Sequence, residues 1–216
     1  MATLWIARHG ETTWNVAGRY QGRMESDLSP LGERQARAIA DAFFARSIAG
    51  DVAPVRIVSS PLRRCLETAR FSAERLGLAV ERDERLIEIA HGTWDGRYRE
   101  TIAGEDPVRF QTWRKDPANV SFENGESLAD VLARWRSFAR DAARATRDTL
   151  VVTHDAVVRC AIVDLSGRTL DDFWNARVEN GAFATLEASD GRLRLVDECD
   201  VRHLGGIRAN VTGQAL

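Results

Sequence analysis

Residues 3–12 read TLWIARHGET, and this stretch decides the fold that the rest of the chain is expected to build. Its first half is short and apolar, which is typical of a buried strand. The polar run that begins at Arg8 ends the strand and brings His9 into a turn. Parallel α/β sheets place their ligand sites beyond the carboxyl ends of the strands, so this turn is a candidate site.

The strand and turn of residues 3–12 have counterparts further along the chain. Further strands are predicted over residues 55–59, 78–80 and 150–153. The last of these leads directly into His154, just as the first leads into His9. Because carboxyl ends of parallel strands meet at one edge of a sheet, we expect the two histidines to share a site. Residues 183–187 and 193–196 are predicted to form a hairpin across Asp190-Gly191.

Between the predicted strands, apolar residues recur at helical spacing, which predicts helices there. A hydroxyl residue at the N-cap or a proline at the first position marks where such helices begin. The helices are predicted to begin at Ser29-Pro30, at Ser60-Pro61 (ending at Gly77) and at Ser127, with another over 157–165. Strands alternating with helices predict a three-layer α/β/α domain with a largely parallel central sheet. Residues 1–216 are expected to form this single domain, with a cap segment around 97–124.

Composition excludes several classes of function. The chain has 216 residues, 30 Lys plus Arg and 32 Asp plus Glu, so its net charge of -2 gives no overall attraction for nucleic acid or an anionic membrane. Its three cysteines form no C-x-x-C pair, so a reducing compartment fits. The first apolar run is cut short at Arg8, too early for a signal peptide or a membrane span, and a cytoplasmic location is expected.

Several motifs together resemble one known family. Residues 8–12 (RHGET), with Asn15, resemble the R-H-G-E-T-x-x-N signature of the histidine phosphatase superfamily, which includes phosphoglycerate mutases. Further matches follow in the family's order: SSPLRR at 59–64, IE at 87–88 before GTWDG at 92–96, GES at 125–127 and VVTH at 151–154. The resemblance covers almost the whole chain and implies a phosphoglycerate mutase-like fold.

The resemblance implies a set of catalytic roles that agrees with the chemistry of phosphoryl transfer. His9 is expected to attack phosphorus and form a phosphohistidine. Glu88 is expected to protonate the leaving alkoxide and then to activate water, which requires a raised pKa. His154 is expected to contact the phosphate in its protonated form. Glu84, Asp83 and Asp95 are nearby carboxylates that compete with Glu88 for its role.

Phosphate binding is assigned to cationic and amide side chains. Arg8 and Arg64 carry the fork-shaped guanidinium that suits phosphate oxygens. Asn15 and Gln21 resemble the family's neutral phosphate donors. With these groups no metal and no cofactor are expected. A metal site built from His9, His91, His154 and an aspartate lacks any ligand spacing and is discounted.

Several functional questions stay open at the level of sequence. The stretch between Glu88 and His154 is shorter than in mutases of the family, which favours a phosphatase, with a cofactor-dependent mutase as the alternative. The loop containing His91 and the late His203 resemble those of metal-independent phosphoserine phosphatases, and both histidines become specificity candidates. The α-ribazole phosphatases and broad-specificity sugar-phosphate phosphatases share most of the same motifs. Asp155 stands where many relatives have glycine, and it either tunes His154 or caps the next helix.

The expected partner is a small phosphomonoester substrate, without nucleic acid or membrane. A catalytically dead scaffold is disfavoured, because the chain retains all the residues assigned to the chemistry. No stretch of sequence fixes the oligomeric state, although relatives of this kind are often homodimers.

Overall fold

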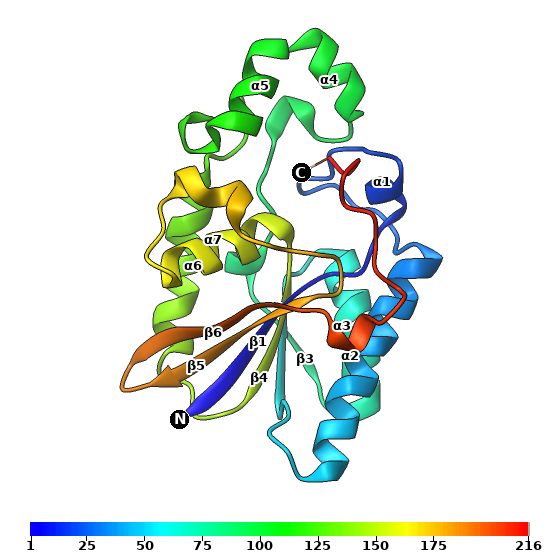
Figure 1. Cartoon of the computed structure of the whole chain (residues 1–216), viewed down its shortest axis with the longest axis vertical. Coiled ribbons are helices and arrows are strands. Elements are labelled where there is room, and N and C mark those ends of the chain that lie inside the picture. The colour runs from blue at the N-terminus through cyan, green and yellow to red at the C-terminus, as the bar shows by residue number, and fades with distance from the viewer. Residues whose placement is uncertain (216) are drawn as a thin grey trace.

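The computed structural model describes residues 1–215 and contains one six-stranded sheet, in the order β3-β2-β4-β1-β5-β6 (Figure 1). The strands are β1 (Ala2–Arg8), β2 (Arg56–Ser59), β3 (Val80–Arg82), β4 (Thr149–Thr153), β5 (Phe183–Ser189) and β6 (Arg192–Asp200). Strands β1 to β4 pair in parallel, whereas β5 and β6 are antiparallel. The predicted α/β fold with a largely parallel sheet is confirmed.

Helices cover both faces of the sheet, as Figure 1 shows. They are α1 (Thr13–Val16), α2 (Pro30–Ala49), α3 (Arg63–Leu76), α4 (Arg99–Glu105), α5 (Pro107–Lys115), α6 (Leu128–Ala142) and α7 (Asp155–Leu165), with short 3-10 helices η1 (Glu84–Leu86), η2 (Gly92–Trp94), η3 (Pro117–Asn119), η4 (Leu170–Asn175) and η5 (Arg202–Leu204). Side chains of a strand alternate between faces. Trp5 of β1 therefore packs with Phe43 of α2, while Leu4 and Ile6 belong to the core cluster of α6 and α7.

Helix boundaries follow the capping signals in two of three cases. The Ser29 hydroxyl accepts a hydrogen bond from Gly32 N, and Ser127 forms a capping box with Asp130. The prediction that Ser60-Pro61 opens a helix is wrong, because α3 begins at Arg63 and its N-cap is Leu62. The Ser60 hydroxyl instead lies 2.7 Å from the Nε2 atom of His154. Ser60, which the sequence predicts to be a helix N-cap, thus lies in the site beside His154.

The predicted hairpin joins β5 and β6. Asp190 and Gly191 both have positive φ, at 54° and 71°, which is the conformation a tight hairpin turn needs. Strand β3 lies two residues later than the sequence predicted.

Residues 97–124 form α4, α5 and η3, which stand beyond the carboxyl ends of the parallel strands (Figure 1). Two tryptophan contacts attach this segment to the body. Trp94 Nε1 donates to Asp106 at 3.1 Å, and Trp174 Nε1 donates to the Trp113 carbonyl at 2.7 Å. The carboxyl-terminal stretch of the chain returns to the same place, beneath α4 and beside α1 (Figure 1). Trp113 of this segment and Ala215 of the terminal stretch line the same cavity as His9, and the role of residues 97–124 as a cap stays a prediction.

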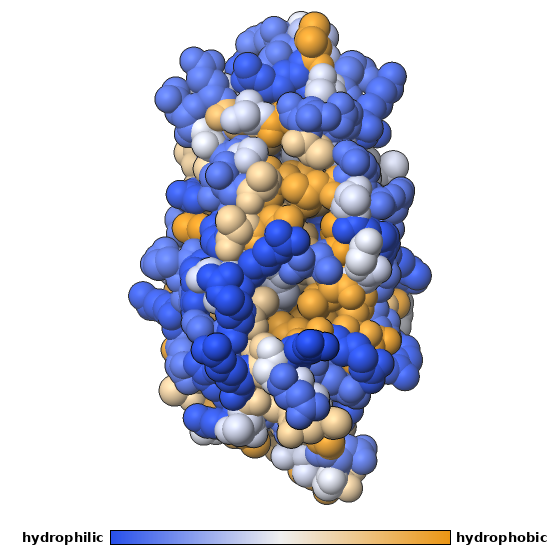
Figure 2. Space-filling model, turned by 90° about the vertical axis from the view of Figure 1, so that its left-hand side faces the viewer, coloured by the Kyte–Doolittle hydropathy of each residue, from blue (hydrophilic) through white to orange (hydrophobic). Residues whose placement is uncertain are grey.

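The side of the molecule that carries α6, α7 and β6 has a band of hydrophobic residues between hydrophilic margins (Figure 2). Leu132, Leu165 and Leu195 of these elements are partly buried and pack on the core. Such a band is typical of contact surfaces, and the homodimer stays a prediction. None of the helices within residues 1–215 has the length and hydropathy that crossing a membrane requires.

Candidate active site

His9 lies at the carboxyl end of β1, and backbone bonds fix its position. Its main-chain N donates to the Thr153 carbonyl of β4 at 2.9 Å. Its Nδ1 lies 2.7 Å from the Gly10 carbonyl, which can only accept, so Nδ1 carries the proton. Burial, followed by the charges of Arg64 and Arg8, lowers the pKa of His9 well below 6.5. The ring is therefore neutral, and Nε2 holds the free lone pair of a nucleophile.

The turn after His9 lies tightly against α2. A Cβ atom on Gly10 would come within 2.4 Å of the Gly32 carbonyl oxygen, so only glycine permits this approach. The packing holds the His9 backbone in place without help from a ligand. Close packing against α2 thus explains why the RHGET motif has a glycine at position 10.

Arg8 is a buried cation with donors to spare. One terminal nitrogen donates to Gln214 Oε1 at 2.7 Å, and the other lies 3.2 Å from Asp155 Oδ1. Its Nε makes no hydrogen bond. Burial lowers the pKa of Arg8, yet a guanidinium remains charged at neutral pH. A buried charge of this kind favours an anionic ligand.

His154 lies next to His9 at the same sheet edge, with ring centroids 5.2 Å apart. Its Nδ1 accepts a hydrogen bond from Arg64 Nε at 3.2 Å, and its Nε2 contacts Ser60. Burial and then the Arg64 charge lower its pKa well below 6.5. Without phosphate, a cation donates to one ring nitrogen of His154, and its protonation beside a bound phosphate stays a prediction. A phosphate dianion beside the ring would raise its pKa again.

Arg64 is wholly buried near the start of α3. Besides His154 it donates to the carbonyls of Gly22 at 2.7 Å and Met24 at 2.9 Å. All three nitrogens of the guanidinium thus have protein partners. Each terminal nitrogen carries a second N–H, so two of the five donors remain for the predicted contact with phosphate.

Two carboxylates, Glu88 and Asp155, line the cavity beside His9, which is called the catalytic cavity below. Glu88 Oε1 accepts from Ile89 N at 2.9 Å and Ala156 N at 3.3 Å. Burial, and after it the charge of Asp155, raises the pKa of Glu88, as a general acid requires. Of its predicted competitors, Glu84 is exposed and Asp83 is paired with Arg85. The third, Asp95, accepts a hydrogen bond from His91 N at 3.1 Å and does not line the cavity.

Asn15 and Gln21 were both assigned to the phosphate. Asn15 Oδ1 accepts from Thr12 N at 3.0 Å in a capping box, while its buried Nδ2 has no partner. Gln21 lines the cavity and accepts from the hydroxyls of Thr12 and Ser26. The unpartnered amide of Asn15 and the placement of Gln21 fit an oxyanion.

The two specificity candidates differ in placement. His91 lines the catalytic cavity, and neither of its buried ring nitrogens makes a hydrogen bond, although Nδ1 lies 3.5 Å from Asp95. His203 does not line it: its ring stacks on Phe183 and its Nε2 lies 2.9 Å from the Gly181 carbonyl. Its assignment to substrate is therefore corrected, because this ring supports the strand end behind the site.

Sequence reasoning missed three polar neighbours of the site. These are Ser60 beside His154, Asn180 with Nδ2 3.3 Å from the His9 carbonyl, and Gln214 on Arg8. Only Ser60 stood inside a recognised motif, and no spacing pattern singles out the other two. The Asp155 carboxylate pairs with Arg159 and Arg8, and in the described part of the chain no side chain caps the start of α7.

Comparison with known proteins agrees with this geometry. The family model of the histidine phosphatase superfamily (branch 1) matches residues 4–200. Phosphoserine phosphatase 1 of Hydrogenobacter thermophilus is 35% identical over 210 residues, which cover 95% of each chain. Glucosyl-3-phosphoglycerate phosphatase of Mycobacterium tuberculosis is 41% identical over 131 residues, 61% of this chain and 56% of that protein. The solved structure of Bacillus stearothermophilus YhfR superposes with a TM-score of 0.87 at 29% identity, covering 94% of this chain and all of that one. The chain belongs to branch 1 of the histidine phosphatase superfamily and is a phosphoric monoester hydrolase.

Proposed function

We propose that the protein is a metal-independent phosphatase of small phosphorylated metabolites that acts through a phosphohistidine on His9, with phosphoserine among its substrates. The observation that carries the mechanism is the pairing of a neutral His9, held at Nδ1 by the Gly10 carbonyl, with a buried Glu88 of raised pKa in one cavity. Together they supply a nucleophile and an acid.

In the first half-reaction, His9 Nε2 forms a bond to phosphorus while the bond from phosphorus to the ester oxygen breaks. The Glu88 carboxyl gives its proton to the departing alkoxide. Arg8 and Arg64 balance the charge on the equatorial oxygens. The product is an alcohol and a phosphohistidine.

In the second half-reaction, water attacks the phosphohistidine. Glu88, now a carboxylate, takes a proton from that water, and the electron pair of the breaking P–N bond returns to His9. Inorganic phosphate leaves, and Glu88 is again protonated. The same residue serves as acid and then as base, as microscopic reversibility requires.

The choice of phosphoserine rests on a relative and on His91. Phosphoserine phosphatase 1 matches 95% of this chain. His91 offers two unbonded ring nitrogens to the catalytic cavity, where a carboxylate or an amino group of the substrate would need a partner.

The first experiment measures phosphate release in EDTA from phosphoserine, 3-phosphoglycerate and p-nitrophenyl phosphate, with His9→Ala as the matched variant. We expect release by the parent protein, fastest from phosphoserine, and none by the variant. An acid-labile phosphoenzyme, trapped in alkali, should form only when His9 is present. Transfer between hydroxyls of phosphoglycerate without release would show a mutase instead, and fast cleavage of other monoesters with none of phosphoserine would end the substrate assignment.

A further inference from the structure

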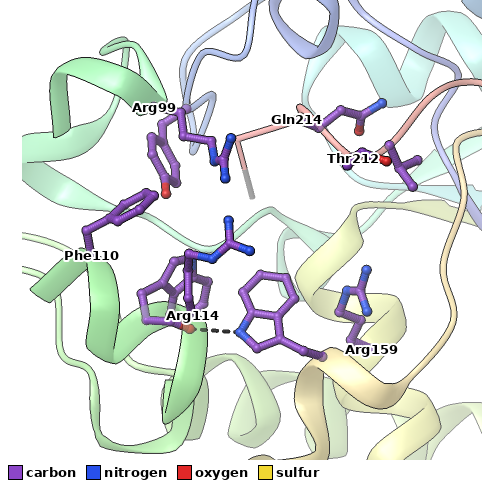
Figure 3. A pocket seen from close by; sticks show the side chains of 10 residues that line it. Arg99, Phe110, Arg114, Arg159, Thr212 and Gln214 are labelled. Atoms are coloured by element: carbon purple, nitrogen blue, oxygen red, sulfur yellow. Dashed lines mark hydrogen bonds between the residues drawn. The ribbon is translucent and has the colours of Figure 1, made fainter. Parts of the chain in front are cut away.

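A second cavity of about 270 Å³ lies beside the catalytic one, which measures about 20 Å³. Its walls come from the cap segment, from α7 and η4, and from the terminal residues 211–214. Figure 3 shows the guanidinium groups of Arg99 and Arg114 entering it from the cap, with Arg159 on the opposite wall. Its lining contains none of the residues that the proposed mechanism uses.

The charged side chains that line the second cavity are all positive. Its lining has three arginines and no aspartate or glutamate. The charge of Arg159 is balanced by Asp155, 2.6 Å away. Within residues 1–215, neither Arg99, which is half-buried, nor Arg114, which is exposed, forms an ion pair. Among the described residues, no carboxylate pairs with these two cations, and both face one space.

The remaining walls are mostly aromatic. Phe110, Trp113 and Trp174 line the cavity together with Tyr20. An engineered cavity of about 150 Å³ holds benzene, so this one has room for a six-membered ring with a substituent. Aromatic walls with a few convergent polar groups are typical of small-molecule sites.

The second cavity is joined to the catalytic one by shared structure. Trp113 lines both, and Tyr20 packs on His91 with ring centroids 5.0 Å apart. Gln214 lines the larger cavity while its amide oxygen binds Arg8. Gln214 therefore connects Arg8 to the lining of the second cavity.

We propose that the second cavity holds the distal part of the substrate and that the preferred substrates are phosphomonoesters with a ring-sized body and a second anionic group, bound by Arg99 and Arg114. The inference rests on the proposed phosphatase mechanism and makes the substrate class narrower. A carboxylate or a further phosphate satisfies the same chemistry, because a guanidinium fork binds either. A compact three-carbon phosphomonoester such as phosphoserine still reaches His9 but leaves most of this cavity unfilled, so we expect it to be a poorer substrate than a ring-sized phosphomonoester with a second anion.

The test uses two probes of the same shape and different charge. These are carboxyphenyl phosphate and carbamoylphenyl phosphate, each in the 3- and 4-substituted forms. The quantity measured is the ratio of kcat/KM for the carboxylate to that for the amide. Arg99→Gln and Arg114→Gln should each lower this ratio about tenfold, the usual worth of one charge-assisted contact. Lys115→Gln is the control, since it removes a neighbouring cation that does not line the cavity.

The outcomes separate this inference from the mechanism on which it rests. A ratio that is unchanged in both arginine variants for both probe forms, or that falls equally in Lys115→Gln, overturns the second anion site while phosphatase activity stands. If no probe is hydrolysed, calorimetry with 4-carboxybenzyl- and 4-carbamoylbenzylphosphonate decides the site by binding alone. Tighter binding of the carboxylate that is lost in Arg99→Gln and Arg114→Gln supports the site, and equal binding of the two overturns it.

Discussion

The Arg8 guanidinium lies 3.2 Å from the Asp155 carboxylate, and the other oxygen of that carboxylate binds Arg159 at 2.6 Å. One buried acid thus joins an arginine of the catalytic cavity to an arginine of the neighbouring cavity. The same acid raises the pKa of Glu88. Asp155 is therefore a positioning residue whose charge reaches both arginines and the proposed general acid.

Replacing Asp155 by asparagine should change stability and pH dependence together. It leaves Arg8 and Arg159 buried without a carboxylate, which we expect to cost about 3 kcal/mol in the free energy of unfolding. It also removes a charge that raises the pKa of Glu88, so kcat/KM should begin to fall at a lower pH than in the parent protein. Urea unfolding and a pH profile measure the two effects. Asp164→Asn, on the same helix but paired with Arg136, is the control; identical profiles for both variants would contradict the role.

Glu88→Gln should abolish most activity and yet stabilise the fold. Loss of a general acid lowers kcat by about 10²–10⁴-fold. Burial raises the pKa of Glu88 in the folded protein above its usual 4.5. This carboxyl therefore ionises at a lower pH in the unfolded chain than in the folded protein. As the pH rises above 4.5, it lowers the free energy of unfolding by a growing amount, until the pH passes the pKa of the folded protein.

Thermal unfolding of Glu88→Gln at a series of pH values checks this sign. The gain in Tm over the parent protein should be largest near neutral pH and should disappear below about pH 4. Glu84→Gln, at an exposed position, serves as the control and should leave Tm unchanged. A loss of Tm at neutral pH would show that Glu88 is ionised and held by cations.

Much of this arrangement could be predicted from the sequence, because the signals involved are local. The apolar run before Arg8 and the one before His154 predicted two central strands, and their parallel pairing brings the histidines to one edge. Ser29 and Ser127 predicted helix starts because each supplies its oxygen to a backbone N–H three residues later.

The wrong predictions concern residues whose sequence neighbours suggest one role while contacts in the folded protein give them another. Ser60 precedes a proline as an N-cap residue would, but its hydroxyl lies at hydrogen-bond distance from His154 Nε2. His203 followed from resemblance alone, and the fold places it behind Gly181. The contact of Gln214 with Arg8 joins opposite ends of the chain, and no periodicity encodes it.

The thiols should be unreactive in the folded protein. Burial raises the pKa of Cys65, that of Cys160 to about 12 and that of Cys199 to about 11. Because the thiolate is the reactive form, at most about one thiol in a thousand is ionised at pH 8. Reaction with a disulfide reagent at that pH should be slow in buffer and complete in guanidinium. Rapid loss of activity on thiol modification would place Cys65, which contacts His154, in a more open environment.

Ligand binding should slow hydrogen exchange in α4 and α5. Arg99 and Arg114 enter the second cavity from these two helices, and Trp113 also lines the catalytic one. An anion held between the arginines and Arg8 therefore ties the cap to the body, and local opening of the cap becomes less frequent. Exchange measured with and without 4-carboxybenzylphosphonate should differ in residues 99–115. Helix α2, which packs on the far side of the sheet from α6 and α7, is the internal control. Equal protection of the cap in both samples would mean that it does not move over the site, and Arg99 and Arg114 would then belong to a fixed wall.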